Sequence, residues 1–206
     1  MIMRNKLGII CMIMGTVLLG GALSLFYYNQ REASEAEKNV LEVLPQIMEQ
    51  IPEVVEEEKL VQLTIPQEML EPEQLVMTEV KIDNESYIGC LSIPDLGLDL
   101  PVMAEWDYER LKKAPCRYAG SILGNDLVLM AHNYEKHFGR ISELRAGDSV
   151  YFSDMDGIVT DYEVIGRDVL SSDAVEEMTA GYYDLTLFTC DYSGKNRVTV
   201  YCDRVE

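Results

Sequence analysis

Cys190 and Arg197 have the types and spacing of a nucleophile and a helper cation. Cys190 closes the β-rich run 185–190, directly before the polar turn 191–195. A thiol at a strand end can be reached by a substrate, whereas a thiol in mid-strand is an inert core residue. Arg197 opens the next predicted strand, so a hairpin would return its guanidinium beside the thiol, where a cation lowers a thiol pKa and stabilises an oxyanion. The alternatives are a buried structural cysteine and a surface salt bridge.

Two histidines occur in the whole chain, and both lie in one short stretch. His132 follows the apolar segment 126–131, which predicts a strand that ends at a sheet rim, where catalytic groups are commonly displayed. The alternative for His132 is a rim histidine bonded to the backbone. His137 comes directly after the polar stretch 133–136, which predicts a solvated surface position. His132 is therefore the stronger functional candidate.

The elements that must position these residues are mainly β-strands. From about residue 87 to the end, alternating or continuous apolar segments are separated by Gly and Asp turn signals. Seven or eight short strands in about 120 residues favour a closed or nearly closed barrel. Short helices are also expected, the last of them capped by Ser172 or Asp173. The predicted strands are 87–94, 98–103, 126–131, 148–153, 158–169, 184–190 and 197–203, and the predicted helices are 107–113, 138–144 and 172–179.

A long apolar segment precedes this region. Residues 7–30 carry no charge, and a helix of about 20 residues spans the roughly 30 Å hydrocarbon core of a bilayer. Arg4 and Lys6 precede the segment, and Tyr27 and Tyr28 lie where an interfacial aromatic belt would be. The positive flank predicts that the N-terminus stays in the cytoplasm and that the rest of the chain is exported.

The apolar segment divides the chain into four parts. We expect residues 1–6 to be a cytoplasmic tail, 7–28 a single-pass membrane anchor, 29–85 an acidic juxtamembrane stalk and 86–206 an extracellular folded domain. A cleaved signal peptide is the alternative, because 22–24 is a small-x-small site. The apolar run is longer than that of a signal peptide and continues past this site, which favours an uncleaved anchor.

Most of the negative charge lies in the predicted stalk. Residues 31–85 contain fifteen acidic and four basic residues, and so carry −11 of the formal −19 of the chain. Apolar residues at helical spacing between 40 and 51 predict an amphipathic helix that stops near Pro52. We interpret the glutamates as a solvated spacer, with a specific cation site as the alternative. The lack of a basic cluster argues against nucleic acid as a partner.

The other cysteines predict structural roles. The chain has five cysteines and no C-x-x-C pair, which argues against a disulfide framework and a zinc ribbon. Cys11 lies in the membrane segment, and Cys90, Cys116 and Cys202 fit small buried hydrophobes, although a Cys90–Cys116 disulfide stays open. A zinc site from His132, His137, Cys190 and Cys202 is the weakest alternative, because H-x4-H alone is no recognised ligand spacing. We expect no metal and no cofactor.

The joint pattern resembles the sortases, membrane-anchored cysteine transpeptidases of Gram-positive bacterial surfaces. Their T-L-x-T-C signature is present at 186–190, with a downstream arginine matched by Arg197 and an upstream histidine matched by His132. Ala131 stands where many sortases have Gly, which we interpret as a subclass feature. The similarity covers roughly 87–205 and lies also in the segments 87–94, 100–102, 117–121 and 138–148.

The resemblance implies a mainly β fold, an eight-stranded closed barrel that follows the membrane helix and the acidic stalk. It implies that the Cys190 thiolate attacks the carbonyl after Thr in an LPxTG-like sorting signal and forms a thioacyl enzyme, which an amine resolves. His132 would protonate the leaving amine and deprotonate the incoming one, while Arg197 would hold the carbonyl or the oxyanion. Thr189 and Asn133 are further candidates for substrate contact, and Asn133 is also a candidate to orient His132.

The implied partners belong to the cell surface. They are surface proteins with C-terminal LPxTG-like sorting signals, a peptidoglycan precursor or a pilin amine as acceptor, and the lipid bilayer through residues 7–28. The long N-terminal segment and the single anchor look more like class B or a related housekeeping type than a pilin polymerase. Two other functions stay open: a Cys/His peptidase that hydrolyses the same acyl enzyme with water, and a non-catalytic anchored surface module.

Overall fold

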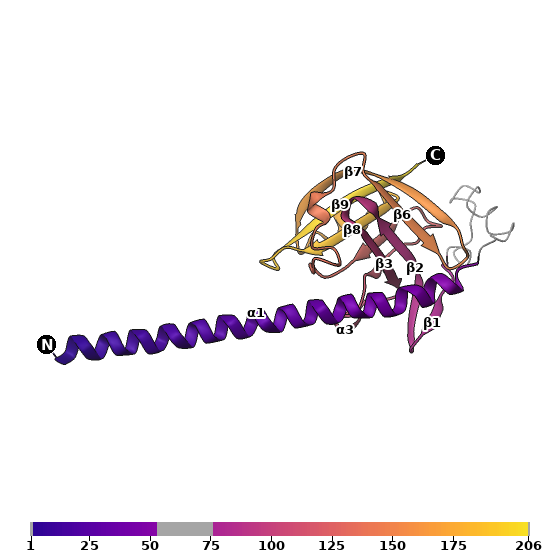
Figure 1. Cartoon of the computed structure of the whole chain (residues 1–206). Coiled ribbons are helices and arrows are strands. Elements are labelled where there is room, and N and C mark those ends of the chain that lie inside the picture. The colour runs from indigo at the N-terminus through magenta and orange to yellow at the C-terminus, as the bar shows by residue number, and fades with distance from the viewer. Residues whose placement is uncertain (1, 53–75, 206) are drawn as a thin grey trace.

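The computed structural model describes residues 2–52 and 76–205, which form a β-barrel with a long N-terminal helix along one side (Figure 1). The strand order in the described sheet is β1-β2-β3-β4-β5-β8-β9-β7-β6, and β6 pairs back with β2. Eight strands therefore close the predicted barrel, and β1 adds a short edge beside β2. The strands are β1 Val80–Ile82, β2 Glu85–Ile93, β3 Leu98–Met103, β4 Cys116–Ala119, β5 Leu127–Met130, β6 Ser149–Asp154, β7 Val159–Ser171, β8 Leu185–Cys190 and β9 Asn196–Arg204.

The barrel core follows from the period-two pattern of its strands. In β6, buried and half-exposed residues alternate, because successive side chains of a strand point to opposite faces. In β8 every residue before Cys190 is buried, since β5 and β9 flank this strand and its outer face is also covered. Buried side chains that fill the interior include Leu91, Val102, Leu129, Phe152, Leu187 and Val200.

Two strands that are distant in the sequence bring His132 and Cys190 to the same edge of the barrel. β5 and β8 pair in parallel, with Leu127 opposite Leu185 and Met130 opposite Phe188. Because the two strands run the same way, their carboxyl ends lie at the same edge of the barrel. The turn between β8 and β9, gold in Figure 1, projects from this edge toward the N-terminal end of the long helix.

The long helix, α1 (Ile2–Gln50), is continuous from the apolar segment to the barrel, with Pro45 inside it. Between Ile9 and Tyr28 its large apolar side chains are exposed, and the helix is long and apolar enough to cross a membrane by length and composition. Further along, Ala36, Val40 and Ile47 are buried at 1%, 8% and 0% exposure. Part of the segment predicted as a solvated spacer therefore packs on the barrel, and the helix ends close to its predicted stop.

The short helices agree in position with the sequence, but their caps differ. α3 (Tyr108–Leu111) begins at Asp107, whose carboxylate accepts hydrogen bonds from two backbone N–H groups at 2.8 and 2.7 Å. α4 (Val175–Thr179) has Ala174 as N-cap without a side-chain bond. The predicted cap by Ser172 or Asp173 is wrong, because the Asp173 carboxylate accepts a hydrogen bond from Ser171 instead. The described 3₁₀ turns are η3 (Pro94–Leu96) and η4 (Ile141–Glu143).

The sequence analysis did not predict two of the strands, β1 and β4. They are three and four residues long, too short to show an alternating pattern.

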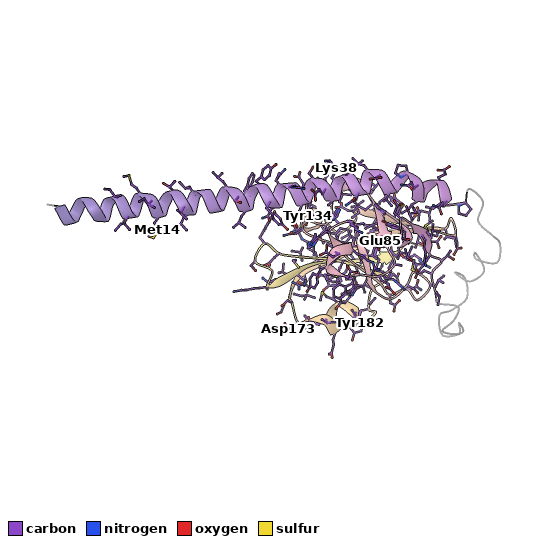
Figure 2. The ribbon with its side chains drawn as sticks, turned by 90° about the horizontal axis from the view of Figure 1, so that it is seen from below. Met14, Lys38, Glu85, Tyr134, Asp173 and Tyr182 are labelled. Carbon is purple, nitrogen blue, oxygen red and sulfur yellow. The ribbon has the colours of Figure 1, made fainter. Side chains whose placement is uncertain are left out.

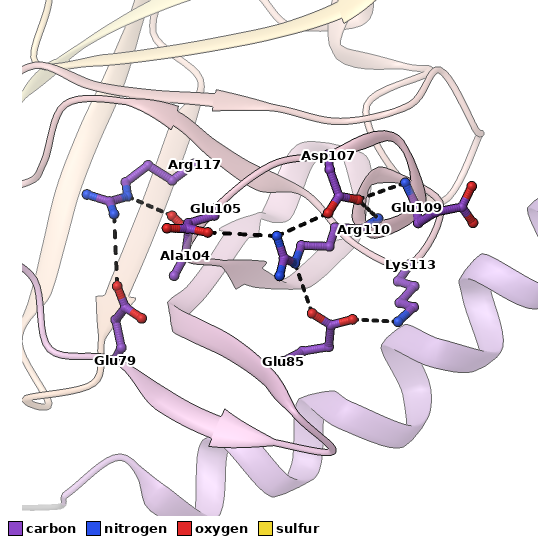
Figure 3. Close-up of polar contacts among 9 residues, drawn as sticks. All are labelled: Glu79, Glu85, Ala104, Glu105, Asp107, Glu109, Arg110, Lys113 and Arg117. Carbon is purple, nitrogen blue, oxygen red and sulfur yellow. Dashed lines mark hydrogen bonds and ion pairs between the residues drawn. The ribbon is translucent and has the colours of Figure 1, made fainter.

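A polar network holds the segment that leads into β4. Glu85 of β2 accepts hydrogen bonds from Arg110 at 2.9 Å and from Lys113 at 2.6 Å (Figure 3). Burial by itself would raise the pKa of Glu85, but these two cations hold it below its ordinary value. The ionised carboxylate thus fixes the α3 segment against β2.

Candidate active site

The β8–β9 hairpin places Cys190 and Arg197 opposite each other. They are Cα partners in the last rung of the antiparallel pair, so their side chains lie on the same face, about 5 Å apart at Cβ. The Asp191 carboxylate closes the turn by accepting hydrogen bonds from Ser193 and Asn196, both at 2.8 Å. The bond from Ser193 above all, with that from Asn196, lowers the pKa of Asp191 to about 2. An ionised carboxylate therefore fixes the turn and, with it, this rung.

The Arg197 guanidinium is held at the same turn. Its Nη1 donates to the carbonyl oxygens of Gly194 at 3.2 Å and Asn196 at 3.1 Å. The side chain is half-buried. Among the described residues, no hydrogen bond joins the guanidinium to the Cys190 thiol. The predicted pairing is therefore present in the backbone register, while the guanidinium engages carbonyl acceptors of its own hairpin.

His132 comes to the same edge through the parallel β5–β8 pair. The Ala131 N–H donates to the Phe188 carbonyl at 3.3 Å, which extends the strand register one residue beyond Met130. One more step along both strands brings His132 beside Cys190, because neighbouring strands lie about 4.8 Å apart. Fifty-eight residues of sequence separate these two positions, and the strand pairing brings them together.

All three candidate side chains belong to the outer face of the barrel. Leu187 of β8, Leu129 of β5 and Val200 of β9 point into the core, and side chains alternate along each strand. Each candidate residue lies three positions from the inward residue of its own strand: Cys190 from Leu187, His132 from Leu129 and Arg197 from Val200. An odd separation puts the two side chains on opposite faces. The three side chains therefore share the outward face of three adjacent strands. The apolar residues Val128, Met178 and Phe188 form a buried cluster on this face.

Thr189 links the two strand ends that carry these groups. Its side chain is 3% exposed, and its hydroxyl donates to the Ala131 carbonyl at 2.8 Å. The bond joins the residue before Cys190 to the residue before His132, and so aligns the two strands at the site. Substrate contact by Thr189 stays a prediction.

The His132 ring is half-buried beside an aromatic side chain. Its centroid lies 5.0 Å from that of Tyr134. Burial lowers the pKa of His132, while the Glu32 carboxylate of α1 raises it and the Lys112 ammonium lowers it. Among the described residues, no hydrogen bond joins Asn133 to His132, so a role for Asn133 in orienting His132 stays a prediction.

His137 is not on the surface, and the sequence interpretation of this residue is wrong. Its side chain is 0% exposed, and neither ring nitrogen has a hydrogen-bond partner in the part of the chain that the structure describes. The backbone of 132–139 turns back on itself, with Phe138 N–H donating to the His132 carbonyl at 3.2 Å. This turn carries His137 inward. Burial lowers the pKa of His137 to about 4, so its imidazole is neutral.

A zinc site does not assemble from the four residues that sequence left open. Cys202 faces Leu185, at the other end of the β8–β9 pair from Cys190. All five cysteines are free, including Cys90 and Cys116. Burial raises the pKa of Cys90 and of Cys116 to about 12, and it also raises that of Cys202. Cys116 and Cys202 are therefore the small buried residues that the sequence predicts, whereas Cys90 is half-buried.

Sequence reasoning missed a cavity that α1 forms with the loop after β5. The cavity measures about 680 Å³, and residues 132–136 line it together with Tyr192 and α1 residues between Phe26 and Glu37. Glu32 is one of these α1 residues. In the sequence Glu32 is indistinguishable from the other glutamates of the acidic stretch, so no local signal could have selected it.

The sequence also matches a family model, the sortase domain, over residues 91–205. The match covers more than half of the chain and includes the three candidate residues. The chain belongs to the sortase family. The expectation drawn from the T-L-x-T-C signature is thereby confirmed at the level of the family.

Individual relatives are similar to the chain at moderate identity. Sortase A of Bacillus anthracis is 28% identical over 126 residues, which are 58% of this chain and 60% of that protein. The chain thus spans less than two thirds of that relative. Sortase C1 of Streptococcus suis is 27% identical, with a TM-score of 0.52 over 58% of this chain and 73% of that chain. Sortase C of Streptococcus pneumoniae, 20% identical, shares the fold with a TM-score of 0.61 over 80% and 97%. The class B-like subclass stays a prediction.

Proposed function

We propose that the chain is a membrane-anchored cysteine transpeptidase that cleaves a sorting signal through a thioacyl enzyme. The observation that carries the proposal is the common outward face of three adjacent strands, which bears Cys190, His132 and Arg197 at one barrel edge. A nucleophile, a proton carrier and a permanent cation are the groups that acyl transfer requires. Family membership supports the same reading.

In the first half-reaction, the Cys190 thiolate attacks the scissile carbonyl carbon of the substrate. A C–S bond forms, and the C–N bond breaks when the tetrahedral intermediate collapses. The leaving amine takes a proton from the His132 imidazolium, which becomes neutral. The product of this step is a thioester on Cys190 and a released C-terminal fragment.

Arg197 supports the charge that develops on the carbonyl oxygen. Its guanidinium already donates to two carbonyl oxygens of its own turn, so a small side-chain rotation exchanges one neutral acceptor for the oxyanion. Hydrogen bonds to an anion are stronger than those to neutral carbonyls, which favours this exchange in the transition state.

In the second half-reaction, a primary amine attacks the thioester. Neutral His132 accepts the proton of the incoming amine, the new amide bond forms, and the Cys190 thiolate leaves. The acceptor that we propose is an amine of a peptidoglycan precursor or of a pilin. Splitting amide exchange into two acyl transfers conserves the energy of the peptide bond in the thioester.

The substrate we propose is a surface protein with an LPxTG-like signal, cleaved after Thr. The outer face beside Cys190 offers apolar contacts for its Leu and Pro. The exposed Trp106 ring lies 5.5 Å from the Tyr118 ring, which packs at 5.2 Å against the buried Phe188 ring. A cavity of about 400 Å³ lies at Trp106 and Tyr118. These aromatic groups support binding of a short apolar segment that ends at the thiol.

We further propose that residues 7–28 anchor the enzyme, with residues 1–6 in the cytoplasm and the barrel outside. The exposed apolar side chains of α1 between Ile9 and Tyr28 support an anchor. The charges of Arg4 and Lys6 support the orientation.

The test is product analysis with a sorting-signal peptide, in the presence and absence of a primary amine. We expect an amine-dependent ligation product and a thioester adduct that Cys190→Ala abolishes. His132→Ala lowers ligation by about 10²- to 10⁴-fold, the size of general acid–base help. Hydrolysis without ligation at any amine concentration would indicate the peptidase, and full activity of Cys190→Ala would overturn the proposal. Absence of cleavage with an unmodified thiol would indicate a non-catalytic module.

A further inference from the structure

The membrane helix forms one wall of the space beside the catalytic histidine. Its residues between Phe26 and Glu37 line the cavity of about 680 Å³, and the opposite wall includes His132 and Tyr134. In Figure 2 the Tyr134 side chain lies beside α1. Apart from Phe26, which lies inside the predicted anchor 7–28, these helix residues directly follow the segment predicted to cross the bilayer, within about two to three helical turns. The catalytic edge of the barrel thus lies against the first turns of α1 outside the membrane.

Glu32 is one of the α1 residues that line the cavity at this edge. Its Oε1 accepts a hydrogen bond from the Tyr28 hydroxyl at 2.7 Å. The Glu32 carboxylate is also close enough to Tyr134 to raise its pKa, although burial is the larger cause. Tyr134 in turn lies between the two imidazoles, with its ring 5.0 Å from that of His132 and 5.5 Å from that of His137. Glu32, Tyr134 and His132 therefore line one cavity, which joins the helix to the site.

The other charges near His132 are largely compensated by partners. Lys136 lies 3.9 Å from Glu37, and Lys112 lies 2.9 Å from Glu109. Glu32 accepts its hydrogen bond from an uncharged hydroxyl, and after Glu109 the Glu32 carboxylate also raises the pKa of Lys112. His137 is neutral, because burial lowers its pKa to about 4. The charged or titratable groups around His132 are Glu32 and Glu37 of α1, Lys112 after α3, Tyr134, Glu135 and Lys136 of the loop, Cys190 of β8 and Arg197 of β9.

We propose that Glu32 is a positioning residue of the active site, which orients His132 through Tyr134 and stabilises its imidazolium, so that the anchor helix is part of the catalytic apparatus. This inference rests on the proposed function, because it takes His132 as the proton carrier. Burial disfavours the imidazolium that must protonate the leaving amine. A carboxylate on α1 opposes that effect when the helix is docked on the barrel.

The experiment uses the full chain in lipid nanodiscs and a fluorogenic sorting-signal peptide, with kcat and KM measured against pH. Glu32→Gln removes the charge and keeps the side-chain size. We expect kcat to fall by about tenfold or more, up to the roughly 10²-fold that a misplacement of about 1 Å costs, with KM nearly unchanged. In the plot of kcat against pH, the inflection that reports the titration of His132 moves to lower pH. The cause is the loss of the carboxylate that raises the pKa of His132. Glu32→Asp keeps the charge and restores this inflection.

Glu35→Gln is the matched control on the same helix. Glu35 is 54% exposed and pairs with Arg31 at 2.8 Å, so its loss should leave kcat and the pH profile unchanged. Profiles of Glu32→Gln and Glu35→Gln that coincide would overturn the inference, as would a fall in kcat with an unmoved inflection, which indicates a merely structural role. Either result leaves the proposed function standing if Cys190→Ala is inactive. Activity of Cys190→Ala would instead defeat the proposed function.

Discussion

Replacing Thr189 by Val removes a hydroxyl and keeps a β-branched side chain, so it tests whether the bond to Ala131 aligns the two catalytic strand ends. The hydroxyl donates to the Ala131 carbonyl at 2.8 Å from a side chain that is 3% exposed. A typical hydrogen bond contributes about 0.5–1.5 kcal/mol, and a buried acceptor left without a donor costs about 1–3 kcal/mol. We therefore expect Thr189→Val to lower the free energy of unfolding by about 1–3 kcal/mol.

Two measurements follow from this value. For a domain of this size, each kcal/mol lowers the Tm by roughly 3–5 °C, which circular dichroism can resolve. The acylation rate with a sorting-signal peptide should fall by up to about 10²-fold, because a shift of about 1 Å between His132 and Cys190 spoils their geometry.

Thr160→Val provides a matched control for the same chemical change. Thr160 is also buried, at 5% exposure, but its hydroxyl has no hydrogen-bond partner among the described residues. Its replacement by Val should therefore leave the Tm unchanged or raise it, and leave acylation unchanged. If Thr189→Val proves no more harmful than Thr160→Val in both measurements, the alignment argument is refuted.

Two further predictions concern charge. Arg197→Lys keeps the cation but loses the planar fork of donors, so we expect most of the acylation rate to be lost, and a rate within about threefold of wild type, under 1 kcal/mol in barrier, would exclude a directed donor. For His137, burial holds the folded-state pKa at about 4, below the ordinary 6.5. The unfolded chain therefore binds more protons between these values, and stability present above about pH 6.5 is lost as the pH falls toward 4. His137→Phe should remove on the order of 2 kcal/mol of the loss between pH 7.5 and 5 in urea unfolding; equal losses in both proteins would contradict this assignment.

Much of the fold could be predicted because its signals are local. Alternating apolar residues and turn signals placed seven of the strands, and the closed eight-stranded barrel agrees with the structure. β4 was not predicted, because its four residues carry a single buried position followed by half-exposed ones. β1 falls in the segment that the acidic composition assigned to a stalk. Short strands owe their conformation to the neighbours that pair with them, and such neighbours leave no local pattern.

The site could be predicted in part for the same reason. A strand that ends in Cys190, followed by a short turn, brings Arg197 opposite by hairpin geometry alone. The solvated position predicted for His137 was wrong. The polar residues 133–136 belong to a turn, and the residue that follows them, His137, points into the protein.

The sequence by itself determined which cysteine and which arginine meet in the β8–β9 hairpin, the period of the strands, and an apolar helix long enough to cross a bilayer. These depend on covalent spacing and on side-chain alternation, which act over a few residues. Only the tertiary structure decided that His132 and Cys190 come to the same edge of the barrel, because that placement needs β5 and β8 to pair in parallel across a long crossover. It also decided that α1 packs on the barrel through Ala36, Val40 and Ile47 and brings Glu32 to the cavity that His132 lines. The acidic segment has many similar glutamates. Which of them lines the cavity with His132 depends on how α1 packs against the barrel, and no short segment of the chain encodes that packing.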